Sequence, residues 1–244
     1  MIRAFLFDLD GTLVQTEKMK ALAYAMAVQR LRNLDQPDEK AIEAYKEIIG
    51  AQQDIASKYI MNKLDLEGDL RLLMPQYDEE TPSLVLRRIW IEIYPGMVAD
   101  PITLKDNQWP YTVDLLREAS KTCLVGIVTG SPRDAVLHVT HSLGLETNID
   151  IIVSGDDVKY GKPHPESYLL AKDKLEVLSE ECLVLEDSVN GVKSAKATGM
   201  NVIAIATPFT DAGLHADQIV EDCQIVHEPD QLLETVRHTI EQHS

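Results

Sequence analysis

The chain has 244 residues, of which 45% are hydrophobic and 26% are charged, and its formal net charge is −17. This composition is typical of a globular protein with one large domain or two small ones. The negative charge argues against nucleic acids and anionic membranes as partners, since both require a basic surface. The apolar runs are much shorter than the roughly 18 residues of a membrane-spanning helix, so no membrane segment is predicted.

The three cysteines, Cys123, Cys182 and Cys223, are far apart in the sequence and form no CxxC pair. They are typical of reduced thiols in or near a core, and they do not indicate a metal site. The opening residues carry no basic stretch and no cleavage site of a secretory signal. We therefore expect a cytoplasmic protein, and the sequence leaves its oligomeric state open.

The first structural signal is an apolar run, Ile2–Phe7, that predicts a buried strand. Two carboxylates, Asp8 and Asp10, follow it directly and precede Gly11. Ligands of open α/β sheets bind at the carboxyl ends of strands. Carboxylates this close raise each other's pKa unless a cation offsets them. The pair therefore indicates a divalent metal, and hard oxygen ligands favour Mg2+, although a bare Asp-x-Asp could also be a solvated turn.

Residues from Val14 to about Tyr94 have a different pattern. Apolar residues recur there at i, i+3, i+4 and i+7, and no strand-like run is present. This stretch predicts a bundle of helices inserted after the first strand. The Pro- and Gly-rich segment Tyr94–Pro101 is expected to end the bundle, and a linker is expected to continue to Trp109–Pro110.

The rest of the chain alternates between strand-like and helical segments. The predicted strands are Cys123–Val128, Ile149–Val153, Cys182–Leu185, Val202–Ala206 and Gln224–Val226. The predicted helices are Thr112–Ala119, Arg133–Leu143, Pro165–Lys174, Asn190–Thr198 and Leu232–Glu241. This alternation predicts an α/β fold with a doubly wound parallel sheet. The expected domains are an α/β core of residues 1–14 and 105–244 and an all-helical cap, with its linker, of residues 15–104.

Polar residues follow several of these strands and could converge at one edge of the sheet. Thr129 offers a hydroxyl and Gly130 an unhindered N–H, which suit a phosphate at a helix N-terminus. Lys162 supplies a positive charge, and Asp187 supplies another hard ligand for a metal at Asp8. Together these groups indicate phosphoryl transfer.

The motifs resemble, in the same order, the four motifs of the haloacid dehalogenase (HAD) superfamily. The matching stretches are Asp8–Thr12, Thr129, Gly161–Pro163 and Glu186–Gly191. The helical insertion resembles the cap of the first HAD subfamily. The combination of Glu-Asp-Ser-x-x-Gly with Gly-Lys-Pro-x-Pro-Glu resembles the β-phosphoglucomutase-like group of sugar-phosphate phosphatases and mutases.

The resemblance implies a role for each carboxylate of the first motif. Asp8 would attack phosphorus and form an aspartyl-phosphate. Asp10 would protonate the leaving oxygen and then activate water, while its backbone carbonyl holds Mg2+. A dehalogenase needs no such acid, so Asp10 argues against cleavage of a carbon–halogen bond.

The same resemblance implies roles for the residues of the other motifs. Thr129 and the Gly130 N–H would bind the phosphoryl group, and Lys162 would offset charge between that group and the nucleophile. Asp187 would be a ligand of Mg2+, with Glu186 beside it as a ligand or a support.

Four further residues are candidates for substrate contact. Ser131 and Arg133 follow the expected phosphate loop, although Arg133 could instead pair with an acidic neighbour. Gln52 and Gln53 lie where the resembling group places a specificity loop.

The sequence of that same loop distinguishes a phosphatase from a mutase. In the mutases it carries a serine–arginine pair that grips a second phosphate, whereas Gly50–Asp54 has no such pair. We therefore predict a phosphatase of a small phosphorylated metabolite, most plausibly a sugar or polyol phosphate. A phosphosugar mutase is the alternative, and a non-catalytic phosphate-binding or scaffold protein is a less favoured one.

Overall fold

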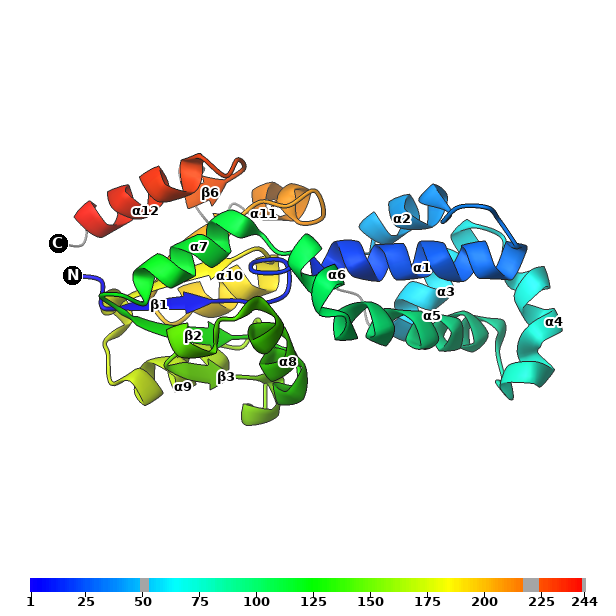
Figure 1. Ribbon diagram of the computed structural model, residues 1–244, viewed down its shortest axis with the longest axis horizontal. Coiled ribbons are helices and arrows are strands. Elements are labelled where there is room, and N and C mark those ends of the chain that lie inside the picture. Colours follow the sequence, from blue (N-terminus) through cyan, green and yellow to red (C-terminus); the bar gives the residue numbers. More distant parts are fainter. Residues whose placement is uncertain (49–52, 217–223, 243–244) are drawn as a thin grey trace. The chain divides into compact units, whose positions relative to one another are not determined.

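The computed structural model describes residues 1–48, 53–216 and 224–242. The chain forms two compact units, one of Met1–Gln15 with Leu104–Ser244 and one of Thr16–Thr103. The sequence analysis placed the two junctions after residues 14 and 104. Figure 1 gives the positions of their elements along the chain.

The described part of the first unit contains a six-stranded parallel sheet with the order β3-β2-β1-β4-β5-β6. Its strands are β1 (Ala4–Phe7), β2 (Leu124–Val128), β3 (Ile151–Val153), β4 (Cys182–Glu186), β5 (Asn201–Ile205) and β6 (Ile225–Val226). Every residue of β1 and β4 is buried, as the apolar runs predict for a sheet covered on both faces. The predicted fold class is confirmed.

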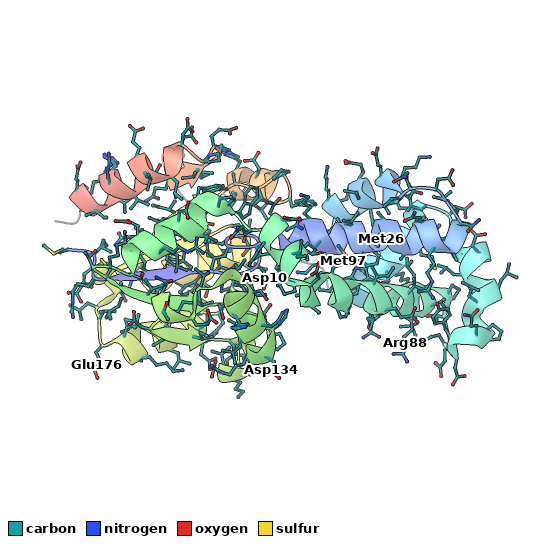
Figure 2. All side chains as sticks on the ribbon, viewed as in Figure 1. Asp10, Met26, Arg88, Met97, Asp134 and Glu176 are labelled. Carbon is teal, nitrogen blue, oxygen red and sulfur yellow. The ribbon has the colours of Figure 1, made fainter. Side chains whose placement is uncertain are left out.

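Helices cover both faces of this sheet (Figure 1). They are α7 (Pro110–Ala119), α8 (Arg133–Leu143), α9 (Glu166–Leu175), α10 (Val189–Lys196), α11 (Asp211–Ala216) and α12 (Gln231–Gln242). Helices α9 and α10 pack against one another and against the sheet, α9 on β2 and β3 and α10 on β4 and β5. Helix α7 packs on β1 and β2, and α12 packs on β5 and β6. Exposed carboxylates such as Asp134 and Glu176 point outward from this unit (Figure 2).

The second unit is helical. Its helices are α1 (Thr16–Arg32), α2 (Glu39–Lys46), α3 (Gln53–Lys63), α4 (Glu67–Tyr77) and α5 (Pro82–Ala99). Aromatic side chains form its centre, where the Tyr24 and Trp90 rings lie 5.6 Å apart and the Tyr24 hydroxyl is 2.9 Å from Ser57 Oγ. Across the described residues, every helix is too short or too polar to cross a membrane.

The expected linker after Tyr94 is wrong. Helix α5 continues through Pro95 to Ala99, and α6 (Pro101–Asp106) follows almost at once. The Asp100 carboxylate accepts hydrogen bonds from the N–H groups of Ile102 and Thr103, at 3.2 and 3.0 Å. Asp100 and Pro101 therefore form a helix start, with a capping carboxylate before a proline at the first helical position. The short helix α11 was also not predicted.

The loop that follows β1 is fixed by the start of α7. Gly11 has a φ of 96°, and its N–H donates to the Val14 carbonyl at 2.7 Å. The Trp109 indole N–H donates to the Gly11 carbonyl at 2.8 Å, and the buried Thr112 hydroxyl donates to the Thr12 carbonyl at 2.7 Å. These bonds set the conformation of the segment that carries Asp10.

We predict that Thr112→Val destabilises the protein. The valine keeps the shape of the side chain but leaves the buried Thr12 carbonyl without the hydroxyl donor. The free energy of unfolding should fall by about 1–2 kcal/mol in urea denaturation. Thr112→Ser, which keeps a hydroxyl, is the control and should lose less. Equal stability of the valine variant and the wild type would show that this bond contributes nothing.

Candidate active site

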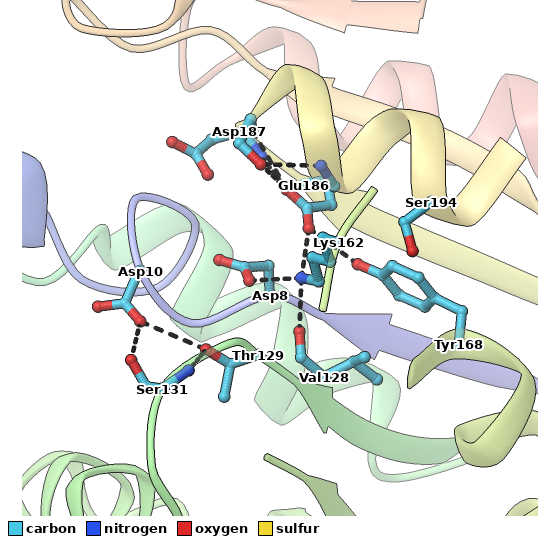
Figure 3. Close-up of polar contacts among 12 residues, drawn as sticks. Asp8, Asp10, Val128, Thr129, Ser131, Lys162, Tyr168, Glu186, Asp187 and Ser194 are labelled. Atoms are coloured by element: carbon cyan, nitrogen blue, oxygen red, sulfur yellow. Dashed lines mark hydrogen bonds and ion pairs between the residues drawn. The ribbon is translucent and has the colours of Figure 1, made fainter. Parts of the chain in front are cut away.

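Strand register brings the main polar groups to one edge of the sheet. Phe7 on β1 pairs with Ile127 on β2 and with Leu185 on β4. The residues that follow these three, namely Asp8, Val128 and Glu186, therefore lie at the same level on adjacent strands. The arrangement matches the convergence predicted from the sequence (Figure 3).

Lys162 connects these three strands. Its Nζ donates to Asp8 Oδ1 at 2.7 Å, to the Val128 carbonyl at 2.8 Å and to Glu186 Oε1 at 2.5 Å. An ammonium group has three protons, so these acceptors use all of them. The loop that carries Lys162 is itself held, because Ser194 Oγ on α10 donates to the His164 carbonyl at 2.7 Å.

Burial and charge change the pKa of both partners. Burial raises the pKa of the Asp8 carboxyl well above its ordinary value; the Lys162 charge opposes this, while nearby Glu186 and Asp10 add to it. Burial alone would lower the pKa of Lys162, but the carboxylates of Asp8 and Glu186 outweigh it and raise that pKa well above its ordinary value. Lys162 is therefore a permanent cation in this cluster.

The carboxylates of Asp8, Glu186 and Asp187 form a cluster that could hold a divalent cation. One oxygen from each lies within 4.8 Å of the others, and all three residues are buried. Gly11 makes room for the cluster, because a Cβ at this position would overlap the Asp187 carboxylate. A buried set of hard oxygen donors with a net negative charge fits Mg2+.

Glu186 also has a structural role. Its Oε2 accepts hydrogen bonds from the N–H groups of Asp187 and Ser188, at 3.1 and 3.2 Å, and from Ser188 Oγ at 3.1 Å. Ser188 in turn caps α10 by accepting from the Gly191 N–H at 3.0 Å. A Cβ at Gly191 would overlap the Glu186 carboxylate, so this close approach requires glycine. Glu186 thus orients the turn that presents Asp187.

Asp10 points toward hydroxyl groups and away from Lys162 (Figure 3). Its Oδ2 accepts from Ser131 Oγ at 2.5 Å and from Thr129 Oγ1 at 3.3 Å. The Ser131 N–H donates to Thr129 Oγ1 at 3.1 Å, and Gly130 between them is exposed. The half-buried Asp10 carboxyl therefore lies beside the predicted phosphate loop.

A second layer supports this loop. The Gly155 N–H donates to the Ser131 carbonyl at 2.9 Å, and a Cβ at Gly155 would overlap the Gly130 carbonyl. Arg133 donates to Asp157 Oδ2 at 2.6 Å, so it pairs with an acidic neighbour, the alternative that the sequence left open. The hydroxyl and amide of Ser154, assisted by Arg133, lower the pKa of Asp157 to about 2.

The two cap candidates, Gln52 and Gln53, belong to the second unit. Gln52 lies outside the described residues. Gln53 begins α3 with an exposed side chain, and its carbonyl accepts from the Tyr24 hydroxyl at 3.4 Å. A contact of either residue with substrate stays a prediction.

Tyr168 is a residue of this site that was not predicted from the sequence. This fully buried tyrosine on α9 donates its hydroxyl to Glu186 Oε1 at 3.0 Å, and its ring centre lies 5.0 Å from Lys162 Nζ. Burial, followed by the charge of Glu186, raises the pKa of its phenol well above the ordinary value. In the sequence, Tyr168 has the spacing of an ordinary core residue on a helix. The one signal that could have identified it is its position six residues after Lys162.

This parallel α/β fold, with buried carboxylates and a lysine at the strand ends, defines a hydrolase of the HAD type. A family model described as haloacid dehalogenase-like hydrolase matches residues 2–199, and the chain belongs to that family. It is 30% identical to a phosphorylated carbohydrates phosphatase of Thermotoga maritima, over 83% of this chain and 84% of the relative. It is 32% identical to a phosphoglycolate phosphatase of Salmonella choleraesuis, over 81% and 79%.

Solved structures support the fold. A β-phosphoglucomutase of Clostridium difficile superposes with a TM-score of 0.64 at 18% identity, covering 100% of this chain and 99% of that one. The family and the phosphatase relatives confirm the predicted family and the predicted enzyme class, a phosphatase of the HAD type.

We predict that Tyr168→Phe slows the reaction without unfolding the protein. Losing the phenol removes one hydrogen bond from the buried Glu186 carboxylate and loosens the position of Lys162. The expected result is a fall in kcat of about tenfold with little change in KM, which corresponds to about 1.4 kcal/mol. Tyr111→Phe on α7 is the matched control. An unchanged kcat would remove Tyr168 as a positioning residue.

We also predict a pH-dependent effect of Asp157→Asn. The depressed pKa of Asp157 means that its carboxylate stabilises the folded state above about pH 4, and that this contribution disappears as the pH falls toward 2. The difference in unfolding free energy between wild type and variant should therefore be largest near neutral pH and narrow in acid. Urea denaturation at several pH values measures it. Asp134→Asn on α8 controls for the loss of one charge, and a pH-independent difference for Asp157→Asn would contradict the assignment.

Proposed function

We propose that the protein is a Mg2+-dependent phosphatase that hydrolyses a small phosphomonoester through an aspartyl-phosphate on Asp8. The observation that carries this proposal is the buried Asp8 carboxylate, held by Lys162 at 2.7 Å beside Asp187 and the acidic cluster. The names of the relatives, a phosphorylated carbohydrates phosphatase and a phosphoglycolate phosphatase, support a sugar phosphate or the phosphate ester of a small acid as substrate.

Asp8 is the nucleophile in this proposal. Its oxygen attacks phosphorus, the bond to the leaving oxygen breaks, and the phosphoryl group is transferred to the carboxylate. Lys162 fixes one Asp8 oxygen and offsets the charge that accumulates when an anionic phosphate approaches this carboxylate. The Gly130 N–H binds the phosphoryl oxygens at the start of the loop before α8, and the Thr129 hydroxyl joins it when its single proton turns from Asp10 Oδ2 to the phosphoryl group.

Asp10 is the proton carrier. Its carboxyl donates a proton to the leaving oxygen, and the resulting carboxylate then takes a proton from the water that hydrolyses the aspartyl-phosphate. The hydroxyls of Ser131 and Thr129 hold this carboxyl on the side of the phosphate loop. Because both hydroxyls contact the same oxygen, Oδ2, the other oxygen is assigned to proton transfer.

The carboxylates of Asp8 and Asp187, together with the Asp10 backbone carbonyl, would hold Mg2+. When bound, Mg2+ neutralises negative charge on the carboxylates and on the phosphoryl oxygens. Glu186 is assigned the supporting role, since Lys162, Tyr168 and the backbone N–H groups of the next turn already engage both of its oxygens.

Hydrolysis is favoured over mutase activity because Gly50–Asp54 lacks the serine–arginine pair for a second phosphate. A non-catalytic phosphate-binding protein is disfavoured. Such a protein would have no use for a buried carboxylate beside a lysine and a second buried carboxylate.

The test is a panel of phosphomonoesters assayed with and without Mg2+. The panel contains 2-phosphoglycolate, sugar and polyol phosphates and β-glucose 1-phosphate. We expect release of inorganic phosphate that EDTA abolishes and Mg2+ restores. Asp8→Asn should lower kcat by at least about a thousandfold while the circular dichroism spectrum is retained. Asp114→Asn, an exposed residue of α7, is the matched control.

Two results would contradict the proposal. Conversion of β-glucose 1-phosphate to glucose 6-phosphate with little free phosphate would make the protein a mutase. Full activity of Asp8→Asn would exclude Asp8 as the nucleophile.

A further inference from the structure

A second cluster of possible metal ligands lies in the first unit and shares no residue with the acidic cluster at Asp8. Its members are Asp211 and His215 on α11 and His227 directly after β6. Asp211 Oδ1 is 3.3 Å from His215 Nε2 and 3.2 Å from His227 Nδ1. The two imidazole rings are nearly parallel, with an interplanar angle of 4° and centres 5.2 Å apart.

The fold explains why these side chains meet. Asp211 and His215 are four residues apart on one helix, so they share a helix face. His227 comes from the strand β6, which pairs with β5, the strand that precedes α11 in the chain. The three ligands thus come from α11 and from the end of the strand that follows it in the chain.

The separations between donor atoms fit a tetrahedral metal. Zinc bonds to imidazole nitrogen and carboxylate oxygen are about 2.0–2.2 Å long, which puts two ligand atoms about 3.3–3.6 Å apart at the tetrahedral angle. The distance from Asp211 Oδ1 to His215 Nε2, 3.3 Å, is at the short end of this range, and the distance to His227 Nδ1, 3.2 Å, is just below it. All three donor atoms lie within 4.8 Å of one another.

The carboxylate of Asp211 provides an independent reason for a cation. Its Oδ1 is buried, and no residue in the described part of the chain donates a hydrogen bond to it. The side chain as a whole is 49% exposed, so only this one oxygen, which faces the two imidazole nitrogens, is shielded from water. A cation between this oxygen and the two ring nitrogens would provide the oxygen with a partner.

An ion can also reach the cluster. The side chains of His215 and His227 are each 42% exposed. His227 also lines a cavity of about 660 Å³, together with Gln231 and His238.

We propose that Asp211, His215 and His227 form a second metal site, which binds Zn2+ or a similar transition metal ion with water in the fourth position. Two imidazoles and one carboxylate favour such ions, whereas Mg2+ prefers oxygen ligands throughout. The bound ion would link α11 to the end of β6. The site is independent of the proposed phosphatase chemistry.

The test uses the full chain, freed of metal with EDTA and then kept in excess Mg2+ to occupy the acidic cluster. Titration with Co2+ should produce the visible absorption of a tetrahedral site, and Zn2+ should displace it. His227→Asn and His215→Asn should each weaken Zn2+ binding, measured by calorimetry, by at least about tenfold. His141→Asn, an exposed histidine of α8, is the matched control and should bind like the wild type.

A second measurement does not depend on variants. Zn2+ should raise the melting temperature of the wild type by mass action, and it should shift the imidazole NMR signals of two histidines. Phosphatase activity in Mg2+ should be the same with and without one equivalent of Zn2+. Equal Zn2+ affinity of wild type and His227→Asn, or no tetrahedral Co2+ absorption, would overturn the proposal and leave Asp211 with two histidines as an ion pair only.

Discussion

The ammonium group of Lys162 is nearly buried, and a buried charge is stable only when it is paired and hydrogen-bonded. Its three acceptors come from the ends of three adjacent strands, β1, β2 and β4. Strand register and the pairing of the Lys162 charge therefore depend on one another, because a shift of any of these strands would leave the ammonium and one of its acceptors without a partner. The same contact sets the position of Asp8, which is why the proposed chemistry depends on a bond that is also part of the core.

The charge balance around Lys162 explains how an acidic protein can bind an anionic substrate. When ionised, the buried carboxylates of Asp8, Glu186 and Asp187 carry three negative charges against the single ammonium in their cluster. A divalent cation would bring this set to neutrality, so the site itself would no longer repel an anionic phosphate. The net charge of −17 is then compatible with an anionic substrate, because charges separated by more than about 10 Å of salt solution are largely screened.

Local sequence patterns were sufficient to predict the sheet and most of the acidic cluster. Apolar runs that end in Asp8, in Thr129 and in Glu186 with Asp187 predict both the strands and the polar edge, since both follow from chain order. Tyr168 could not be found in this way, because a buried phenol on a helix has the periodicity of any core residue and its partner Glu186 is remote in sequence. The linker predicted after Tyr94 was wrong for a different reason. Proline next to Asp100 marks a helix start as readily as a loop, and only the N–H groups that the carboxylate accepts from distinguish the two.

The two candidate metal sites differ in a way that physical chemistry can interpret. The cluster at Asp8 offers only hard oxygen atoms, while the cluster at Asp211 offers two nitrogen atoms and one oxygen. Transition metals bind most ligand sets more tightly than Mg2+ does, so donor type and geometry must provide the selectivity. An imidazole pair near the surface suits zinc better than the buried carboxylates do, because it contributes neutral ligands and leaves a position for water.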